Sequence, residues 1–462
     1  MDLYDFSQAT ARRVAGLRAA FSSGRTRPFA WRVEQLRALK ALLTDRADEI
    51  CAALWSDLRK SPLEAEVSEQ GFVIAEIDHT LANLARWLKP RRVRVPLISQ
   101  PGRARIVHEP LGVVLIIGAW NYPVNVLLAP LVGALAGGNA ALLKPSEAAP
   151  ATAEAMARLL PQYLDGEAVA VVEGGAEETQ AILDLKFDHI FFTGSAHRGR
   201  AILEKAAQHL TPVTLELGGK SPCLVDESAD LAVTARRIAW GKFINAGQTC
   251  VAPDFVLVHR AVEEKLLAGL RHAIFEFYGD DPRRSPDYCR IVNDRNFARL
   301  KRLISDGQVF CGGETDAGER YIAPTILRNV SIDAPVMQEE IFGPILPVIA
   351  VPDMGAAMDF VNSRPKPLVL YLFSNSRAVE NEVVERTTSG NVCINEVVLH
   401  LVVPELPFGG VGPSGMGRYH GRWSFDTFTH AKGVLHKSVL LDLPIRYPPY
   451  TESRRQWLQL LL

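Results

Sequence analysis

The chain has 462 residues, too many for one ordinary hydrophobic core, so two or three lobes are expected. Hydrophobic residues make up 48% and charged residues 22%, a balance that excludes extended disorder. Lys and Arg number 51 against 52 Asp and Glu, so no basic surplus indicates a nucleic-acid partner, and none is expected.

Cysteine usage and the first residues indicate the compartment. Six cysteines are scattered without CxxC spacing, which is typical of neither a disulfide framework nor a zinc site. The opening residues, MDLYDFSQATARR, are polar and lack the apolar stretch of a signal peptide. We therefore expect a cytoplasmic protein without a bound metal.

The N-terminal part of the chain predicts helices. Apolar residues recur at helical spacing over residues 6–23, 31–58 and 62–88. Residues 91–107 then alternate in character and contain prolines, which predicts extended arms.

Residues 111–143 contain no Asp, Glu, Lys, Arg or His and are long enough to span a bilayer. A spanning helix should be continuous, whereas this range is interrupted by Asn121, Pro123, Asn125, Pro130 and a Gly-Gly-Asn turn at 137–139. We interpret it as strand, loop, helix and strand in a buried core, with no transmembrane segment.

Short apolar runs that predict strands begin in the same range. They cover residues 113–117, 140–143, 168–172, 190–192 and 213–215, with helical patterns at 151–164 and 177–185 between them. A second series covers residues 223–225, 255–258, 346–351, 368–373 and 392–395. Alternating strands and helices predict parallel sheets, so the fold class is α/β with two doubly wound, Rossmann-like lobes.

Polar residues follow four strands of the first series. They are Asn121 in AWNYP, Lys144 and Glu147 in LLKPSE, Gly194 and Ser195 in FFTGS, and Glu216 in LELGG. Each has an ordinary structural explanation, such as a turn, a solvated charge or close packing. Because carboxyl ends of parallel strands share one edge of a sheet, the set together predicts a ligand site there.

Cys250 is the candidate nucleophile. It lies in GKFINAGQTCVAP, where it follows small and polar residues rather than the branched apolar ones that surround a core cysteine. A lone cysteine needs an activating base and an oxyanion site before it counts as catalytic.

These motifs carry a resemblance. The chain resembles NAD(P)-dependent aldehyde dehydrogenases, and within that superfamily the class 3 branch. The matching stretches are AWNYP, LLKPSE, FTGS, LELGGKSP, NAGQTC, QEEIFGP, LPFGGVGPSGMGRYHG and SFDTF, in the family's order over residues 110–430.

The resemblance implies a covalent mechanism. Cys250 would attack the aldehyde carbon, and the Asn121 side-chain amide and Cys250 backbone N–H would hold the oxyanion. Hydride transfer to NAD or NADP would leave a thioester, and Glu216 would activate the water that hydrolyses it.

The resemblance also implies the cofactor contacts. Lys144 and Glu147 would meet the adenine ribose, and Glu340 of QEEIFGP the nicotinamide ribose. The remaining implied contacts are Gly194, Ser195 and Gly199 at the pyrophosphate and Phe342 and Trp120 at the nicotinamide end.

Two positions depart from the family's pattern. Arg198 stands where a branched apolar residue usually lies near the adenine. An arginine there would stack on the adenine or pair with a 2′-phosphate, unless it points into solvent. Asn395-Glu396 replaces the Asn-Asp of class 3 relatives near the substrate entrance. The first departure leaves the choice between NAD and NADP open.

Substrate residues are inferred from position. Tyr122, Trp240 and His400 are candidates to line the entrance, together with Val397 and Val398. Such a lining suits medium- or long-chain aliphatic or aromatic aldehydes, although each residue also suits core packing.

The expected subunit has three parts: a cofactor-binding domain (1–90 and 108–216), a catalytic domain (217–400), and an oligomerisation arm with the C-terminal tail (91–107 and 401–462). The resemblance implies a homodimer. Two alternatives stay open, a CoA-acylating relative and a non-catalytic binding protein, and the apolar end WLQLLL adds peripheral membrane contact as a third, additive one.

Overall fold

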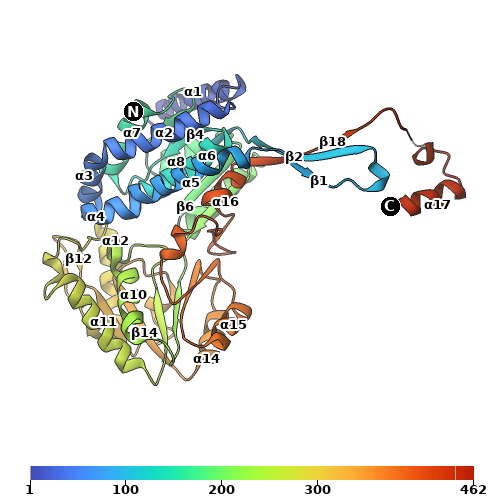
Figure 1. The fold of residues 1–462 in the computed structure, drawn as a ribbon. Helices are drawn as coiled ribbons and strands as arrows, with labels where there is room; N and C mark the ends of the chain where they lie inside the picture. The colour runs from blue at the N-terminus through green and yellow to red at the C-terminus, as the bar shows by residue number, and fades with distance from the viewer. Residues whose placement is uncertain (1, 443, 462) are drawn as a thin grey trace.

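The computed structural model describes residues 2–442 and 444–461 of the chain. Two α/β lobes lie one against the other, and a thin arm projects from the side of the upper one (Figure 1). The predicted fold class is confirmed. We call the lobe built on the six-stranded sheet the first lobe and the lobe built on the seven-stranded sheet the second lobe.

The first lobe has the strand order of a Rossmann fold. Its order is β5-β4-β3-β6-β7, all parallel, with β17 antiparallel at the edge beyond β7. The strand order reverses between β3 and β6, where ligands bind in such sheets. The strands are β3 (Val113–Ile117), β4 (Ala140–Lys144), β5 (Val169–Val171), β6 (His189–Gly194), β7 (Val213–Leu217) and β17 (Gly415–Met416).

Helices cover both faces of this sheet. Successive side chains of a strand point to opposite faces, where they join two different apolar clusters. Val113, Leu115 and Ile117 pack with α1, α8 and α9, whereas Val114 and Ile116 pack with α5, α6 and α7. The helices are α1 (Leu3–Ser22), α2 (Phe29–Asp45), α3 (Ala47–Leu58), α4 (Pro62–Ala65), α5 (Gly71–Trp87), α6 (Asn125–Gly137), α7 (Pro150–Tyr163), α8 (Ala176–Leu183), α9 (Ala196–Ala207) and α16 (Gly421–Thr427).

Residues 111–143 form the centre of the first lobe, as predicted. Strands β3 and β4 are buried throughout, and so is α6 from Val126 onward. Among the helices of the described residues, none combines the length and the apolar composition needed to cross a membrane.

Two predicted helices are wrong in detail. The helix predicted over 31–58 is broken at Arg46, which separates α2 from α3. The helix predicted over 62–88 contains a π-helical turn, η1 (Glu66–Gln70), which directs both Glu69 and Gln70 into the interior. Neither the break at Arg46 nor the turn at 66–70 contains a Gly or Pro, so the sequence gives no local sign of either break.

The second lobe has the strand order β10-β13-β14-β9-β8-β15-β16, parallel except for β10. Its strands are β8 (Pro222–Val225), β9 (Phe255–His259), β10 (Gln308–Cys311), β13 (Thr325–Arg328), β14 (Ile345–Val351), β15 (Val369–Phe373) and β16 (Asn391–Ile394), with a small ribbon of β11 (Thr315–Asp316) and β12 (Tyr321–Ile322). Its helices are α10 (Leu231–Phe243), α11 (Glu263–Tyr278), α12 (Asp294–Leu303), α13 (Pro335–Gln338), α14 (Met354–Asn362) and α15 (Arg377–Arg386).

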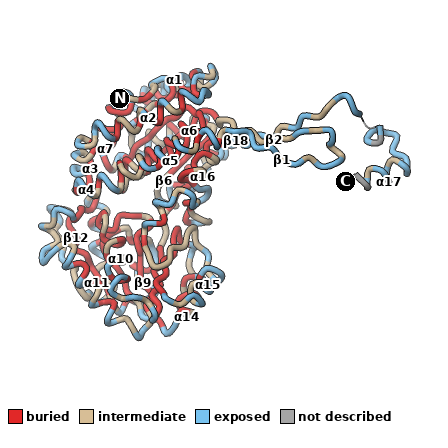
Figure 2. Tube along the Cα trace, in the orientation of Figure 1, coloured by how far each residue is buried: buried red, intermediate tan, exposed pale blue. Residues whose placement is uncertain are grey.

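The arm is an antiparallel sheet of β1 (Arg91–Val93), β2 (Gly102–Pro110) and β18 (Thr429–Lys437). Apart from Thr429, its strand residues are exposed or half-buried, in contrast to the lobes (Figure 2). Helix α17 (Glu452–Leu461) follows it near the arm's tip (Figure 1). Leu462 and the side chains of Leu460 and Leu461, part of the apolar end WLQLLL, lie outside the described residues.

The boundary predicted at 401 for the arm and tail is wrong. Before β18, the chain pairs β17 with β7 and packs α16 against α5 and α6 of the first lobe. The Gly- and Pro-rich run predicted to lack regular structure therefore contributes an edge strand, because Gly415 can approach the β7 backbone with a φ of +146°.

Candidate active site

Cys250 is presented by a backbone with a run of left-handed residues. Helix α10 ends at Phe243 and is followed by η3 (Ile244–Gly247), in which Asn245, Ala246 and Gly247 have φ values of +52°, +50° and +73°. A Cβ at Gly247 would lie 2.2 Å from the Gly343 carbonyl oxygen, so that position requires glycine. Strained backbone of this kind clusters at functional sites.

Gln248, two residues before Cys250, anchors this loop. Its amide nitrogen donates to the carbonyl oxygens of Asn245 and Arg290, both at 3.0 Å, and its side-chain oxygen accepts from the Val292 N–H at 3.0 Å. The Gln248 side chain is fully buried, and these bonds satisfy it.

Asn121 joins the loop after β3 to the Cys250 loop. Its Nδ2 donates to the Gln248 carbonyl at 3.0 Å, and its own carbonyl accepts from Asn245 Nδ2 at 2.8 Å. The Tyr122 hydroxyl is 2.8 Å from Thr249 Oγ1. An amide nitrogen carries two hydrogens, so Asn121 keeps one donor for a ligand next to Cys250.

A buried ion pair between Lys60 and Glu69 holds the Asn121 loop in place. Lys60 Nζ lies 2.6 Å from Glu69 Oε1, and both side chains are completely buried. Lys60 also donates to the Asn121 carbonyl at 3.3 Å, while Glu69 Oε2 accepts the N–H groups of Val124 and Asn125 at the start of α6. The pair thus fixes both ends of the turn that carries Asn121.

Glu216 belongs to β7 and does not follow it, contrary to the prediction that the strand ends at Leu215. It is 4% exposed, and neither carboxyl oxygen has a hydrogen-bond partner among the described residues. Burial raises the Glu216 pKa well above its usual value. A buried carboxyl without partners is suited to exchanging a proton with a ligand.

The electrostatics disfavour an ionised thiol. The pKa of Cys250 is raised to about 12, first by burial and then by the carboxylates of Glu340 and Glu216. The pKa of Glu340 is itself raised to about 8, mainly by burial and then by Asp254. Both acids are therefore near enough to Cys250 for their charges to oppose ionisation of the thiol.

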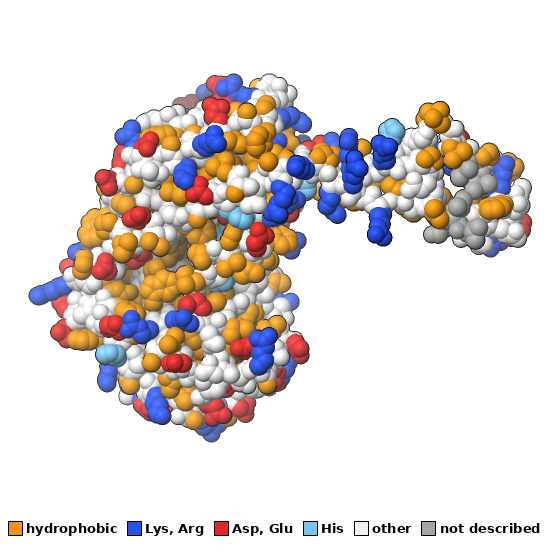
Figure 3. All heavy atoms as spheres, in the orientation of Figure 1, with side chains coloured by type: hydrophobic (Ala, Val, Ile, Leu, Met, Phe, Trp, Pro, Cys, Tyr) orange, Lys and Arg blue, Asp and Glu red, His pale blue; other side chains and the backbone are white. Residues whose placement is uncertain are grey.

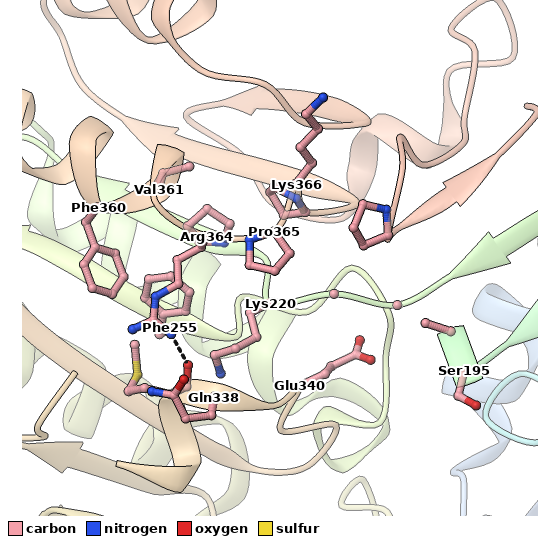
Figure 4. A pocket seen from close by; sticks show the side chains of 17 residues that line it. Ser195, Lys220, Phe255, Gln338, Glu340, Phe360, Val361, Arg364, Pro365 and Lys366 are labelled. Atoms are coloured by element: carbon pink, nitrogen blue, oxygen red, sulfur yellow. Dashed lines mark hydrogen bonds between the residues drawn. The ribbon is translucent and has the colours of Figure 1, made fainter. Parts of the chain in front are cut away.

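A cleft between the lobes lies next to these acids. Figure 4 shows Glu340 directed toward the side of the cleft where Ser195 lies. Gly218 leaves room for Glu340, because a Cβ there would be 2.0 Å from Glu340 Oε2. The residues that line this cleft include Ser195, Gly218, Gly219 and Glu340.

Other predicted cofactor residues lie in three small groups. Lys144 Nζ is 2.7 Å from Glu147 Oε2, and Arg198 Nη1 is 3.2 Å from Glu147 Oε1. The rings of Trp120 and Phe342 meet edge to face with centroids 5.2 Å apart. Ser195 caps α9, Gly199 packs α9 against Leu217 of β7, and Gly194 ends β6.

The three predicted substrate residues have different surroundings. Tyr122 lies over the Lys60 ammonium, which is 4.0 Å from the ring centroid, and Trp240 is half-buried against the core. His400 is 9% exposed and packs between Tyr371 and Phe408, with no partner in the described residues for either ring nitrogen. Burial lowers the His400 pKa to about 4, so the ring is neutral.

Sequence reasoning missed several buried polar residues around the site. Lys60, Glu69 and Tyr371 were not predicted, and neither was Lys242. The Lys242 Nζ is buried with no hydrogen-bond partner in the described part of the chain, and burial lowers its pKa to about 8. Lys60 lies in an ordinary polar segment, and a charged residue inside α10 normally faces solvent, so the sequence contains no signal for either. Among the described residues no His, Cys, Asp and Glu cluster could hold a metal ion.

Comparison with known proteins gives concordant matches. The aldehyde dehydrogenase family matches residues 5–434. Aldehyde dehydrogenase family 3 member A2 of Rattus norvegicus is 48% identical over 453 residues, 98% of this chain and 94% of that one. Member B1 of the same organism is 50% identical over 441 residues, 95% of this chain and 94% of that one.

A solved structure agrees with the sequence comparisons. The substrate-bound state of Staphylococcus aureus AldH superposes with a TM-score of 0.95 at 43% identity, covering 97% of this chain and 98% of that one.

The coupling between Glu340 and Cys250 predicts a pH-dependent difference in thiol reactivity. Below pH about 8 Glu340 is protonated, so Glu340→Gln and wild type should react alike with iodoacetamide at Cys250. Above that pH only wild type carries the carboxylate that opposes the thiolate, so the variant should react faster, by roughly twofold to tenfold.

The rates are measured by peptide mass spectrometry without cofactor, with Cys250→Ser as the blank. Glu339→Gln is the matched control, because that neighbouring acid is 54% exposed and pairs with Arg299. An equal acceleration in both variants, or none in Glu340→Gln, would contradict the coupling.

Proposed function

The chain belongs to the aldehyde dehydrogenase family and oxidises aldehydes to carboxylic acids with NAD or NADP, and on that premise we propose that the reaction proceeds through a covalent intermediate on Cys250. The observation that carries the proposal is the junction of Asn121 with the Cys250 loop beside the buried, unpartnered Glu216.

In the first step the Cys250 sulfur bonds to the aldehyde carbon, and the electron pair of the C=O double bond moves to oxygen. The free N–H of Asn121 and the backbone N–H of Cys250 would stabilise this oxyanion. The thiol proton must leave, and the raised pKa values make the buried Glu216 and Glu340 carboxylates effective acceptors.

The residues of the cleft fit a dinucleotide. Gly218 and Gly219 provide space, Ser195 at the N-terminus of α9 suits the pyrophosphate, and the unpartnered Glu340 Oε1 suits a ribose hydroxyl. The chemistry that NAD or NADP supplies is acceptance of a hydride, and loss of that hydride from the thiohemiacetal carbon leaves a thioester on Cys250.

Hydrolysis is assigned to Glu216. Water attacks the thioester carbon, its proton passes to the Glu216 carboxylate, and the carbon–sulfur bond breaks to release the acid and the thiolate. Its raised pKa makes the Glu216 carboxylate a stronger base and displaces its ionisation to higher pH. The alternative acyl acceptor is CoA, and the presence of Glu216 argues for water.

The substrate class is proposed to be medium- or long-chain aliphatic or aromatic aldehydes. The support is apolar surface on η6 (Leu399–Val402) and the residues after it, beside the predicted substrate residues. Leu399, Val402, Val403 and Leu406 are 42%, 61%, 42% and 47% exposed. Comparing kcat/KM along a series of alkanals of increasing chain length tests this, and a decline with chain length would contradict it.

We propose that the chain forms a homodimer through one face of the arm. The strand register places Val93, Ala104, Ile106 and Leu435 on one face of the sheet, together with Arg91, and one edge of β18 pairs with no strand of the described residues. Leu435 is 58% exposed, so this face offers apolar side chains that a partner copy could bury. A monomer in sedimentation velocity, unchanged by Leu435→Glu, would contradict this.

The opposite face of the arm supports peripheral membrane contact. Arg92, Arg103, Arg105 and Lys432 share it by register, and Lys and Arg gather along the arm (Figure 3). Past β18, Val439 and Leu440 are 93% and 95% exposed. Basic and apolar groups together suit an anionic lipid surface. Equal vesicle binding by the full chain and one truncated after Pro449 would exclude a contribution of the C-terminal end.

A cytoplasmic location is proposed from the cysteines, because all six carry free thiols, as in a reducing compartment. Recovery of the protein from an oxidising compartment in cell fractionation would contradict this.

The covalent mechanism predicts distinct behaviour for two variants. Cys250→Ser should abolish formation of reduced cofactor. Glu216→Gln should give one burst per active site and then a steady rate at least about 100-fold below wild type, because the amide cannot accept a proton from water. In wild type the steady rate should rise with pH, because only the ionised Glu216 accepts a proton from water and its raised pKa displaces ionisation to higher pH.

The measurement is absorbance of the reduced cofactor in a stopped-flow instrument, with product identified by chromatography. Multiple turnovers in Glu216→Gln would remove Glu216 from hydrolysis. Acyl-CoA in place of acid, when CoA is supplied, would favour the CoA-acylating alternative.

Arg198 is proposed to permit NADP. One carboxylate oxygen of Glu147 pairs with Lys144 and the other with Arg198. Two cations and one anion therefore leave a net positive charge where the adenine ribose is expected. Arg198→Val should lower the ratio of NADP to NAD efficiency on the order of tenfold, the effect of losing about 1.4 kcal/mol.

Arg200→Val on the same helix is the control, because that arginine is also exposed. Initial rates with each cofactor give the ratio, and an unchanged ratio in Arg198→Val would exclude the role.

A further inference from the structure

Tyr371 lies in the middle of β15, and its side chain is completely buried. A phenol hydroxyl at such a position needs hydrogen-bond partners, because a buried polar group without them is costly. Tyr371 has two. It donates to the Val251 carbonyl oxygen at 2.5 Å and accepts from the Val398 N–H at 3.2 Å.

The first partner is the residue after the nucleophile. The backbone N–H groups of Cys250 and Val251 both lower the Cys250 pKa, against the larger effect of burial. Their effect depends on how the backbone at Val251 is turned relative to Sγ. The bond from Tyr371 fixes the Val251 carbonyl oxygen, so it holds in place the chain directly after Cys250.

The second partner belongs to the segment 397–402, which contains predicted substrate residues. Val398 has a φ of +62°, which a β-branched residue rarely adopts. Val397 packs against Gly241 near the end of α10, where a Cβ would lie 2.4 Å from the Val397 side chain. The segment is thus held both to α10, which leads to Cys250, and to the Tyr371 hydroxyl.

We propose that Tyr371 is a positioning residue whose hydroxyl holds the Cys250 loop with its backbone N–H groups toward Sγ, and that couples this orientation to the segment 397–402. The inference rests on the proposed role of Cys250 as the nucleophile. Tyr371 acts through Val251 and Val398, so its role concerns orientation rather than contact with the reacting atoms.

The test replaces Tyr371 by Phe, which removes one oxygen and keeps the ring. The matched control is Tyr288→Phe, because Tyr288 is 1% exposed and its hydroxyl donates to a backbone carbonyl, that of Ile322, at 2.8 Å. Tyr371→Phe loses two buried hydrogen bonds and Tyr288→Phe loses one. Only Tyr371 has a bond to the nucleophile loop.

The readout is the rate of Cys250 alkylation by iodoacetamide as a function of pH, which needs no catalysis. Tyr371→Phe should displace the profile to higher pH and slow alkylation at a fixed pH by roughly threefold to tenfold, as expected for one hydrogen bond. The kcat/KM for an aldehyde should fall by a similar factor. Tyr288→Phe should lower only the Tm.

A second variant tests the coupling from the other side. Val398→Gly keeps the N–H but relieves the strained φ, so the bond to Tyr371 should loosen and the alkylation profile should move in the same direction. Identical profiles for wild type and Tyr371→Phe, or an equal displacement in Tyr288→Phe, would overturn the inference. If Tyr371→Phe displaces the profile while Cys250→Ser still turns over aldehyde, the proposed function fails and the positioning role stands.

Discussion

The hydrogen bonds of Asn121 with Gln248 and Asn245 are the constraint on which the site depends. They join two loops 127 residues apart in the chain, one after β3 of the first lobe and one after α10 of the second. The Lys60–Glu69 pair sets the position of the Asn121 loop, and Gln248 sets that of the Cys250 loop. The proposed oxyanion site, assembled across two lobes, requires that neither loop moves, and the buried hydrogen bonds around both loops meet that requirement.

Burial decides the chemistry of the resting site. Cys250, Glu216 and Glu340 all have raised pKa values, and burial is the largest cause for each. The neutral forms are therefore favoured until an aldehyde and a cofactor change the surroundings. This arrangement protects the thiol from unproductive ionisation and places two strong proton acceptors beside it.

The sequence predicted most of the fold, and its motifs identified the candidate catalytic residues, but it did not predict the buried polar residues that support them. Strands β3 to β7 were predictable because they are continuous apolar runs, and Asn121 and Cys250 because motifs carry them. The break at Arg46 has no Gly or Pro to mark it. Glu216 was placed after β7 because a charged residue rarely lies inside a buried strand. The ion pair of Lys60 with Glu69 depends on tertiary contacts that no local pattern records.

The central claim is that the acyl group is carried by Cys250 and released by Glu216. Intact-protein and peptide mass spectrometry of Glu216→Gln, quenched after mixing with an aldehyde and NAD, tests it most directly. The account predicts an added mass equal to the acyl group on the peptide containing Cys250, and little in wild type, where hydrolysis is fast. An unmodified Cys250 peptide together with reduced cofactor, or an acyl group on another residue, would contradict it.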